Sequence, residues 1–354
     1  MIRHSIFSEE TQKAVASASA VFRCHPYFLK NYGWCKELLL NRKAPDEAAK
    51  AVRLGIRHAQ ALRLDAGMLP VVYIDWMLPE IFEESGNRGI RKEVFLDSMK
   101  DIEIWIKVFR KYHEDRTGLD RIEWVFKSLS GKVRRFGSLQ FEEVTYEFPC
   151  LIFENRRTGS YAALAAPSLK VDQDGYISGT NGRPCERERE TFLSFDGGRV
   201  TGFPSDPEQG IIRMEEASTL SLSEWEPVLV PGEKAVAVHI PAGADLSPEK
   251  IDLALTAGKE FYEGDLLVCD SWLLDPHLKY ILPEKSRILD FMNRFYKMPV
   301  KATAPQILER VMGFDFSMDS LGNYPCTTSL QKALKNYLLE GKEMFTTAGF
   351  LPWK

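Results

Sequence analysis

Apolar positions recur at three- and four-residue steps through the first third of the chain. One stripe comprises Ala48, Val52, Gly55, Ala59 and Leu62, and a second comprises Phe95, Met99, Ile102, Ile106 and Phe109. This spacing places apolar side chains on one face of an α-helix, so the region is predicted to be helical. Residues 71–78 between the stripes are almost continuously apolar, a pattern compatible with either a strand or a short buried helix.

The pattern changes near residue 130. Beyond it come short runs rich in aromatic and β-branched residues, separated by turn clusters such as Asp174-Gly175 and Asp196-Gly197-Gly198. This pattern is typical of an antiparallel meander, with candidate strands at 134–145, 150–153, 160–165, 191–195 and 210–214. We therefore expect a helical N-terminal domain over residues 1–130 and a second domain over residues 131–354.

A third pattern follows residue 232. Residues 234–240 and 266–270 are predicted strands, and Ser247-Pro248 between them has the N-cap serine and first-turn proline of a helix. Strand, helix and strand in this order indicate a parallel crossover. A further helix is expected to begin at Asp275-Pro276, and a last amphipathic helix is expected over 328–346.

Composition and charge narrow the function. The 354 residues carry 46 basic and 50 acidic side chains, a net charge of −4, so no basic excess is available for nucleic acid. The N-terminus lacks the apolar segment of a signal peptide, and no apolar stretch is long enough to span a bilayer. Together with six scattered cysteines, this favours a soluble, cytoplasmic protein with reduced thiols, and no metal site is expected.

Standard catalytic motifs are absent. The chain has no G-x-G-x-x-G, no Walker A loop, no G-x-S-x-G and no H-E-x-x-H. Their absence weakens dinucleotide-binding, NTPase, α/β-hydrolase and zinc-protease interpretations.

The segment around His239 is the most informative. In the strand 234–240, Ala235, Ala237 and His239 share one face, which would leave space beside it. The following loop contains Gly243 and leads into the N-terminus of a helix, where backbone amides are able to hold a pyrophosphate. Such a turn also occurs in α/β folds that bind no phosphate.

Two long runs resemble a known family. They read VHIPAGADLSPEKIDLALTAGKEFY and LLVCDSWLLDPHLKYILPEKSRILDF, and they resemble the GNAT-like C-terminal domain of bacterial acyltransferases. The upstream run RFGSLQFE is similar to the first strand of that domain, and the helical first third is similar to the N-acyltransferase N-terminal domain that accompanies it. The resemblance implies an α+β fold, with a helical N-terminal domain followed by a mixed, mostly antiparallel sheet flanked by helices and a C-terminal helical tail.

The same resemblance implies acyl-CoA as a co-substrate. Pantetheine would lie between strands 234–240 and 266–270, and pyrophosphate would lie on the loop that follows the first. The residues implied in binding are Val238, Ile240, Pro241, Ala242, Gly243, Ala244, Leu246, Ser247, Ser271 and Trp272. The loop departs from the usual Gln/Arg-x-x-Gly-x-Gly/Ala pattern, since only Gly243 and Ala244 match it in part, and Asp245 adds a negative charge near the phosphates.

Acyl transfer from a thioester needs a base for the acceptor and an acid for the leaving thiolate. His239 is the first candidate base, because imidazole titrates near neutrality, although it could instead pack in the core. Glu142 is the second, on a strand face shared with Ser138 and Gln140 that could instead face solvent. Tyr280 is the candidate acid by the family resemblance, with core packing as its alternative.

Three functional interpretations remain open. The favoured one is an enzyme that moves an acyl group from acyl-CoA to a small amine or hydroxyl. The second is a non-catalytic GNAT-fold module that binds a ligand or regulates a partner. The third is a hydrolase that uses Cys269 or Ser271 with His239. The sequence names neither the acceptor, the acyl length nor the oligomeric state.

Overall fold

The structure is a computed structural model that describes residues 2–354. The chain forms two compact units. The first contains Met1–Glu142, His239–Asp245 and Leu253–Gly258, and the second contains Glu143–Val238, Leu246–Asp252 and Lys259–Lys354. These units are made of discontinuous segments and do not test the predicted domain boundary near residue 130, which stays a prediction.

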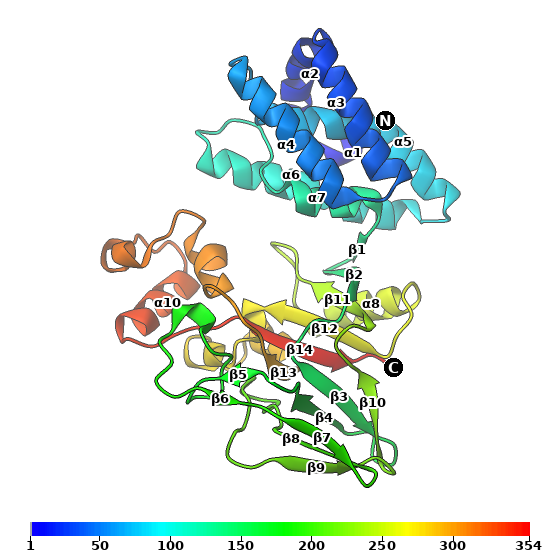
Figure 1. The fold of residues 1–354 in the computed structure, drawn as a ribbon. Coiled ribbons are helices and arrows are strands. Elements are labelled where there is room, and N and C mark those ends of the chain that lie inside the picture. The colour runs from blue at the N-terminus through cyan, green and yellow to red at the C-terminus, as the bar shows by residue number, and fades with distance from the viewer. Residues whose placement is uncertain (1) are drawn as a thin grey trace. The chain divides into compact units, whose positions relative to one another are not determined.

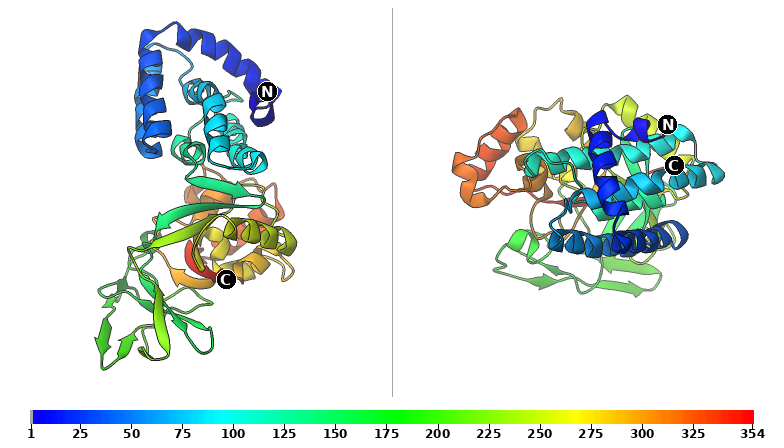
Figure 2. Two further views of the ribbon diagram at one scale, coloured as in Figure 1. Left: turned by 90° about the vertical axis from the view of Figure 1, so that its right-hand side faces the viewer. Right: turned by 90° about the horizontal axis from the view of Figure 1, so that it is seen from above.

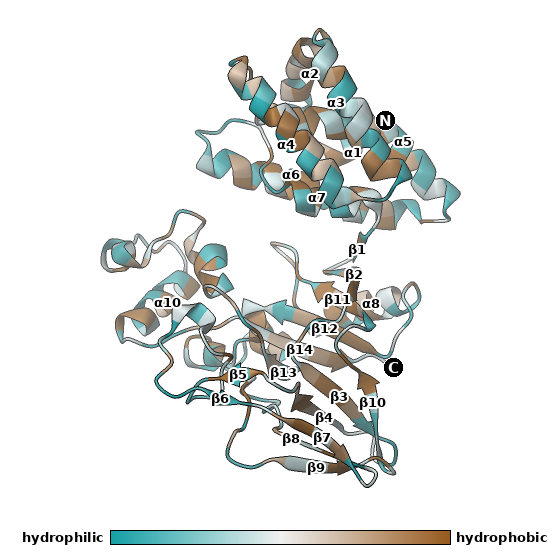
Figure 3. Cartoon of the chain, in the orientation of Figure 1, coloured by the Kyte–Doolittle hydropathy of each residue, from teal (hydrophilic) through white to brown (hydrophobic). Residues whose placement is uncertain are grey.

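The first unit is mainly helical, as the sequence predicts. Its helices are α1 (Ile2–Ile6), α2 (Glu9–Arg23), α3 (Pro26–Lys36), the π-helix η1 (Glu37–Asn41), α4 (Pro45–Ala61), α5 (Met68–Asn87), α6 (Lys92–Tyr112) and α7 (Ile122–Ser130) (Figure 1). Both predicted stripes lie in helices. The stripe residues within α4 are all buried, whereas Leu62, which caps the helix directly after Ala61, is exposed; in α6 the whole stripe is buried. Figure 3 shows the resulting alternation of apolar and polar patches along α4.

The ambiguous residues 71–78 belong to a long helix. They form the buried middle of α5, which also accommodates Pro79. The hydroxyl of Tyr73, fully buried, donates to the carbonyl of Phe28 at 2.8 Å. Burial on nearly all sides explains why this segment lacks helical periodicity in its sequence.

The main sheet has six strands in the order β1-β2-β11-β12-β14-β13. Their bounds are β1 (Val133–Phe136), β2 (Leu139–Thr145), β11 (Lys234–His239), β12 (Leu266–Ser271), β13 (Tyr296–Pro299) and β14 (Thr347–Pro352). The β11–β12 pair is parallel, whereas β1–β2, β12–β14 and β13–β14 are antiparallel. The predicted α+β class, with a mixed and mostly antiparallel sheet, is confirmed.

The predicted strand 134–145 is two strands. β1 and β2 form a hairpin whose register pairs Phe136 with Leu139. The turn between them places Gly137 at φ +59°, a left-handed conformation that glycine adopts at little cost.

Smaller sheets occupy the middle of the chain. They are β10-β3-β4, β5-β6 and β7-β8-β9, and Figure 2 shows their green strands gathered on one side of the yellow and red strands of the main sheet. Their bounds are β3 (Cys150–Asn155), β4 (Tyr161–Ala165), β5 (Lys170–Val171), β6 (Arg189–Glu190), β7 (Leu193–Asp196), β8 (Arg199–Gly202), β9 (Ser218–Ser221) and β10 (Trp225–Leu229).

Two strand predictions in this region need correction. The expected strand 191–195 is only partly a strand, because residues 191 and 192 lie between β6 and β7, and β7 begins at Leu193. The expected strand 210–214 is wrong: Gly210 has φ +67°, and only Ile212 makes an isolated bridge, to Ser205. Arg213 turns instead to Asp206, with its Nη2 at 2.6 Å from the Oδ2 of that carboxylate.

The last third contains α8 (Pro248–Lys259), η3 (Trp272–Leu274), η4 (Pro276–Tyr280), α9 (Arg287–Met292), the π-helix η5 (Leu308–Met312), η6 (Met318–Asn323) and α10 (Ser329–Leu339). The helix expected from Asp275 is the short 3₁₀ helix η4. The helix expected over 328–346 ends at Leu339, and the chain then enters β14 between β12 and β13. Within residues 2–354, no helix combines the length and apolarity needed to cross a membrane.

β11 and β12 remain paired over only part of their length. Their parallel register joins Val236 to Leu267 and Ala237 to Val268, and it stops there. On its other side β12 is paired along its whole length with β14. The two parallel strands therefore separate toward their carboxyl ends. Ala235 and Ala237, which were expected to leave space, pack into an apolar cluster with Val268 and Phe350.

Candidate active site

A histidine, a carboxylate and a lysine meet in the first unit. His239 ends β11, Glu142 lies in β2 and Lys127 lies in α7. His239 Nε2 is 3.2 Å from Glu142 Oε2, and Lys127 Nζ is 2.8 Å from Glu142 Oε1. Each oxygen of the carboxylate thus faces one nitrogen.

Glu142 is buried, with 7% of its side chain exposed. The face that it shares with Ser138 and Gln140 is also buried, so the alternative of a solvent-facing strand is wrong. Burial acts to raise the pKa of Glu142, but the hydrogen bonds and charges of His239 and Lys127 outweigh it, and the net pKa is lowered. A carboxylate with these properties remains ionised and holds the imidazole, which suits it poorly to accept a proton itself.

The imidazole of His239 is fixed on two sides. Its ring meets the Trp124 ring edge-on, with centroids 4.9 Å apart and an interplanar angle of 80°. Because an ionised Glu142 only accepts hydrogen bonds, Nε2 carries the hydrogen and Nδ1 of the neutral ring is the acceptor. With 28% of its side chain exposed, His239 is in contact with solvent to a greater extent than Glu142.

A second layer of polar contacts supports Trp124. The indole Nε1 donates to Asp101 Oδ2 at 2.6 Å, and Gln140 Nε2 donates to the same oxygen at 2.7 Å. Asp101 is 2% exposed and lies in α6. The contacts form a chain from Asp101 through Trp124 to His239, which fixes the plane of the imidazole.

The loop after His239 turns through a left-handed glycine. Gly243 has φ +74°, and a Cβ placed there would meet no atom within 4 Å. Ala242, Gly243 and Asp245 are exposed. The amide of Ala244 donates to the carbonyl of Pro241 at 3.1 Å, so it is engaged inside the turn. Helix α8 begins at Pro248, directly after Ser247, as predicted.

The remaining predicted site residues lie in the second unit. Ser271 is buried and its hydroxyl accepts a hydrogen bond from the amide of Leu273, while Trp272 packs against an apolar cluster that includes Leu278. Tyr280 is 74% exposed, and its ring neighbours are His277 and Tyr337. The alternative that Tyr280 packs in the core is therefore wrong.

Cys269 is a poor nucleophile. It is 2% exposed, and burial, reinforced by Asp270, raises the pKa of its thiol well above the usual range. A thiol in this state is protonated at neutral pH. With Ser271 engaged as a helix cap, this argues against the hydrolase interpretation. In residues 2–354, no three His, Cys, Asp or Glu side chains are grouped as metal ligands would be.

Two protein families match the chain. The N-acyltransferase N-terminal domain matches residues 4–131, and the GNAT-like C-terminal domain matches residues 133–351. No curated protein matches the chain.

Solved structures share the fold. An acyltransferase mutant in complex with octanoyl-CoA has 16% identity and a TM-score of 0.58, over 100% of this chain and 86% of that one. An acyltransferase in complex with decanoyl-CoA and teicoplanin has 17% identity and a TM-score of 0.51, over 86% of this chain and 77% of that one. Since one family match spans more than half of its residues, the chain belongs to the GNAT-like C-terminal domain family.

Proposed function

We propose that this protein is an acyltransferase that moves an acyl group from acyl-CoA to a small amine or hydroxyl acceptor. The main support is that the pairing of β11 with β12 ends at Ala237↔Val268 and that His239 lies just beyond it, at the end of β11. Family membership and a fold shared with acyl-CoA-bound acyltransferases support the donor. The teicoplanin bound by one of those proteins supports a small-molecule acceptor.

The donor would be bound mainly by backbone. Pantetheine amides would pair with the edge of β11 that β12 leaves, near Val238 and Ile240. Pyrophosphate would lie on amides of Ala242, Gly243 and the start of α8, where the helix dipole favours negative charge. Ser271 and Trp272 would border the thioester end of the same gap.

His239 would act as the general base. Its Nδ1 takes a proton from the neutral amine or hydroxyl as that group attacks the thioester carbonyl. The new bond to the acceptor forms, the carbon–sulfur bond breaks, and CoA leaves as a thiolate that takes up a proton. Glu142 stabilises the imidazolium, and Lys127 holds Glu142 in place. Tyr280 is proposed as the proton donor to the thiolate.

Two further proposals concern the domains and the location of the protein. The family matches change between residues 131 and 133, which supports domains at 1–130 and 131–354. The scattered cysteines favour a cytoplasmic location.

The test combines binding with turnover. Octanoyl-CoA should raise the melting temperature by mass action, and release of free CoA thiol should report transfer across a panel of small amines and alcohols. His239→Gln should retain the thermal shift and lower turnover by about a hundredfold or more. His58→Gln in α4 is the matched control and should retain turnover.

Two results would count against the proposal. Undiminished turnover in His239→Gln would show that the histidine only packs. A thermal shift without transfer to any acceptor would favour the alternative, a non-catalytic ligand-binding or regulatory module.

A further inference from the structure

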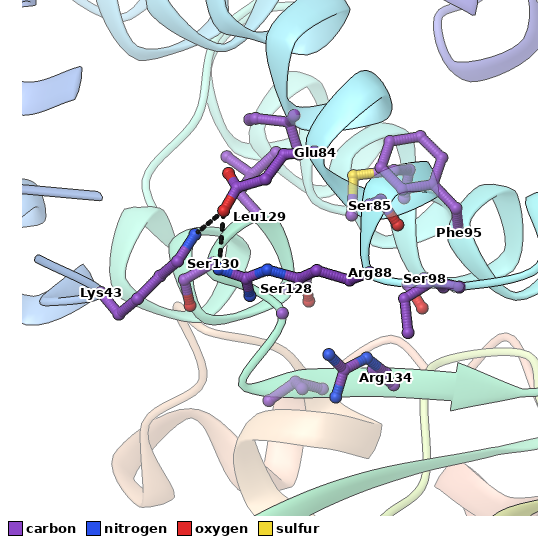
Figure 4. A pocket seen from close by; sticks show the side chains of 15 residues that line it. Lys43, Glu84, Ser85, Arg88, Phe95, Ser98, Ser128, Leu129, Ser130 and Arg134 are labelled. Atoms are coloured by element: carbon purple, nitrogen blue, oxygen red, sulfur yellow. Dashed lines mark hydrogen bonds and ion pairs between the residues drawn. The ribbon is translucent and has the colours of Figure 1, made fainter. Parts of the chain in front are cut away.

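The first unit contains a small cavity whose lining does not include His239. Figure 4 shows its lining, which comes from α5, α6, α7, β1 and the segments after η1, α5 and α7. Its volume is about 40 Å³. One ordered water needs roughly 10–15 Å³ measured in the same way, so the cavity holds more than one water but no nucleotide.

The charged lining residues of this cavity are Lys43, Glu84, Arg88 and Arg134. Glu84 Oε1 lies 2.7 Å from Lys43 Nζ and 2.6 Å from Arg88 Nη2, the two contacts drawn as dashed lines in Figure 4. Three cationic side chains and one carboxylate thus line the cavity.

One lining hydroxyl has no partner. Ser128 is 3% exposed, and its Oγ makes no hydrogen bond within the described part of the chain. Two neighbouring lining serines are satisfied, since Ser98 Oγ donates to Val94 O and Ser130 Oγ donates to Lys127 O. A buried hydroxyl is costly to leave unpaired, so Ser128 calls for an acceptor in the cavity.

We infer that this cavity binds a small oxyanion of the phosphate class. An oxyanion only accepts hydrogen bonds, and the cavity offers a hydroxyl, an ammonium and guanidinium groups as donors. The C-terminal ends of α5 and α7 also border it and act against an anion, each with about half a negative charge. The cationic side chains of the lining act in the opposite sense.

The position of the cavity gives the anion a structural role. Arg88 follows α5 directly, Ser128 lies in the last turn of α7, and Arg134 lies in β1. A bound oxyanion would connect these three elements at one point. It would therefore stabilise the helical unit without taking part in acyl transfer.

Inorganic phosphate is the probe. Thermal unfolding of the full chain in phosphate-free buffer should shift upward on adding phosphate, by more than sodium chloride achieves at equal ionic strength. Arg88→Gln should weaken the apparent phosphate affinity at least tenfold. Lys50→Gln, which removes one exposed charge from α4, is the matched control and should retain the affinity.

Ser128→Ala gives the sharper test, because it removes only the unpaired hydroxyl. Without phosphate, this variant should melt at or above the wild-type temperature. With saturating phosphate, it should melt at a lower temperature than wild type, so that the order of the two melting temperatures reverses. The inference is overturned if phosphate acts no differently from chloride, or if Ser128→Ala and Arg88→Gln respond to phosphate as Lys50→Gln does. Equal responses would mean that water fills the cavity.

Discussion

His239 Nε2 contacts Glu142 Oε2 at 3.2 Å across a separation of 97 residues. The two side chains differ in exposure, with 7% for Glu142 and 28% for His239. The carboxylate therefore lies on the dry side of the pair and the imidazole on the wetter side. This order lets the protein keep a fixed negative charge behind the ring while the ring remains accessible.

Glu142→Gln should reduce the free energy of unfolding by about 2 kcal/mol at neutral pH, because Lys127 and His239 lose an ionised partner. The lowered pKa of Glu142 sets the pH dependence. Its stabilisation is present above the ordinary carboxyl pKa and is lost as pH falls through the folded-state pKa. Urea unfolding should therefore show the two proteins converging in acid.

The neighbouring Glu143 provides the control for Glu142. It is exposed in the same strand, so Glu143→Gln should be close to wild type at every pH. A constant difference between Glu142→Gln and wild type down to strongly acidic pH would contradict an ionised, paired carboxylate.

Trp124→Phe should lower kcat several-fold and leave the affinity for acyl-CoA unchanged. The smaller ring retains part of the contact with His239 but loses the hydrogen bond to Asp101, so the imidazole gains freedom to tilt. Steady-state kinetics separate kcat from KM, and Trp34→Phe, at a 51% exposed position in α3, is the control. An increased KM with unchanged kcat would instead place Trp124 in substrate binding.

Lys297→Met should stabilise the protein at neutral pH. Lys297 is 4% exposed in β13, and burial, with a smaller contribution from Lys279, lowers its pKa from the usual 10.5 to about 8. Below pH 8 the lysine is charged in both the folded and unfolded states, and the folded state bears an electrostatic cost of up to about 3 kcal/mol. This cost disappears as pH rises toward 10.5, because the unfolded state then loses its proton as well.

The measurement is a pair of denaturant titrations of wild type and Lys297→Met, at neutral and at alkaline pH. The advantage of the variant should shrink between them. An advantage that is equal at both pH values would mean that packing rather than charge distinguishes the two side chains.

Gly258→Ala should destabilise the protein by about 1–2 kcal/mol, although alanine favours helices by about 1 kcal/mol over glycine. A Cβ at Gly258 would lie 2.8 Å from Phe141 Cζ, and Phe141 is fully buried against Phe136. Gly86→Ala in α5 is the matched control, because its Cβ would meet no atom within 4 Å. Calorimetry should show a lower Tm for Gly258→Ala and an unchanged Tm for Gly86→Ala. Equal Tm values for the two variants would show that the Phe141 ring moves aside at little cost.

Sequence patterns predicted the helices whose apolar face or first turn is specified by nearby residues. The apolar stripes gave α4 and α6, and the turn residues Ser247-Pro248 gave the start of α8. His239 was found because a titratable residue at a strand end before a glycine loop is a local signal. The helix at 71–78 was ambiguous because burial on all sides removes the periodicity on which such a prediction depends.

The residues that hold the neighbours of His239 had no such signal. Asp101 and Lys127 occupy ordinary positions in α6 and α7, and only the folded chain brings Asp101 to Trp124 and Lys127 to Glu142. The expected strand 210–214 failed for a similar reason. There the Asp206–Arg213 pair and the left-handed Gly210 shape a loop, and neither is visible in a hydrophobicity pattern.

The position of β14 determines when the main sheet can be completed during synthesis. β14 is paired on one edge with β12, from Ser271↔Thr347 to Leu266↔Pro352, and on the other with β13. Yet it follows both in the chain, so a ribosome releases two strands before the one that separates them. During that interval β12 and β13 present unpaired edges, which are prone to association with other chains. We expect nascent-chain protease protection of the second unit to appear only after β14 has left the exit tunnel.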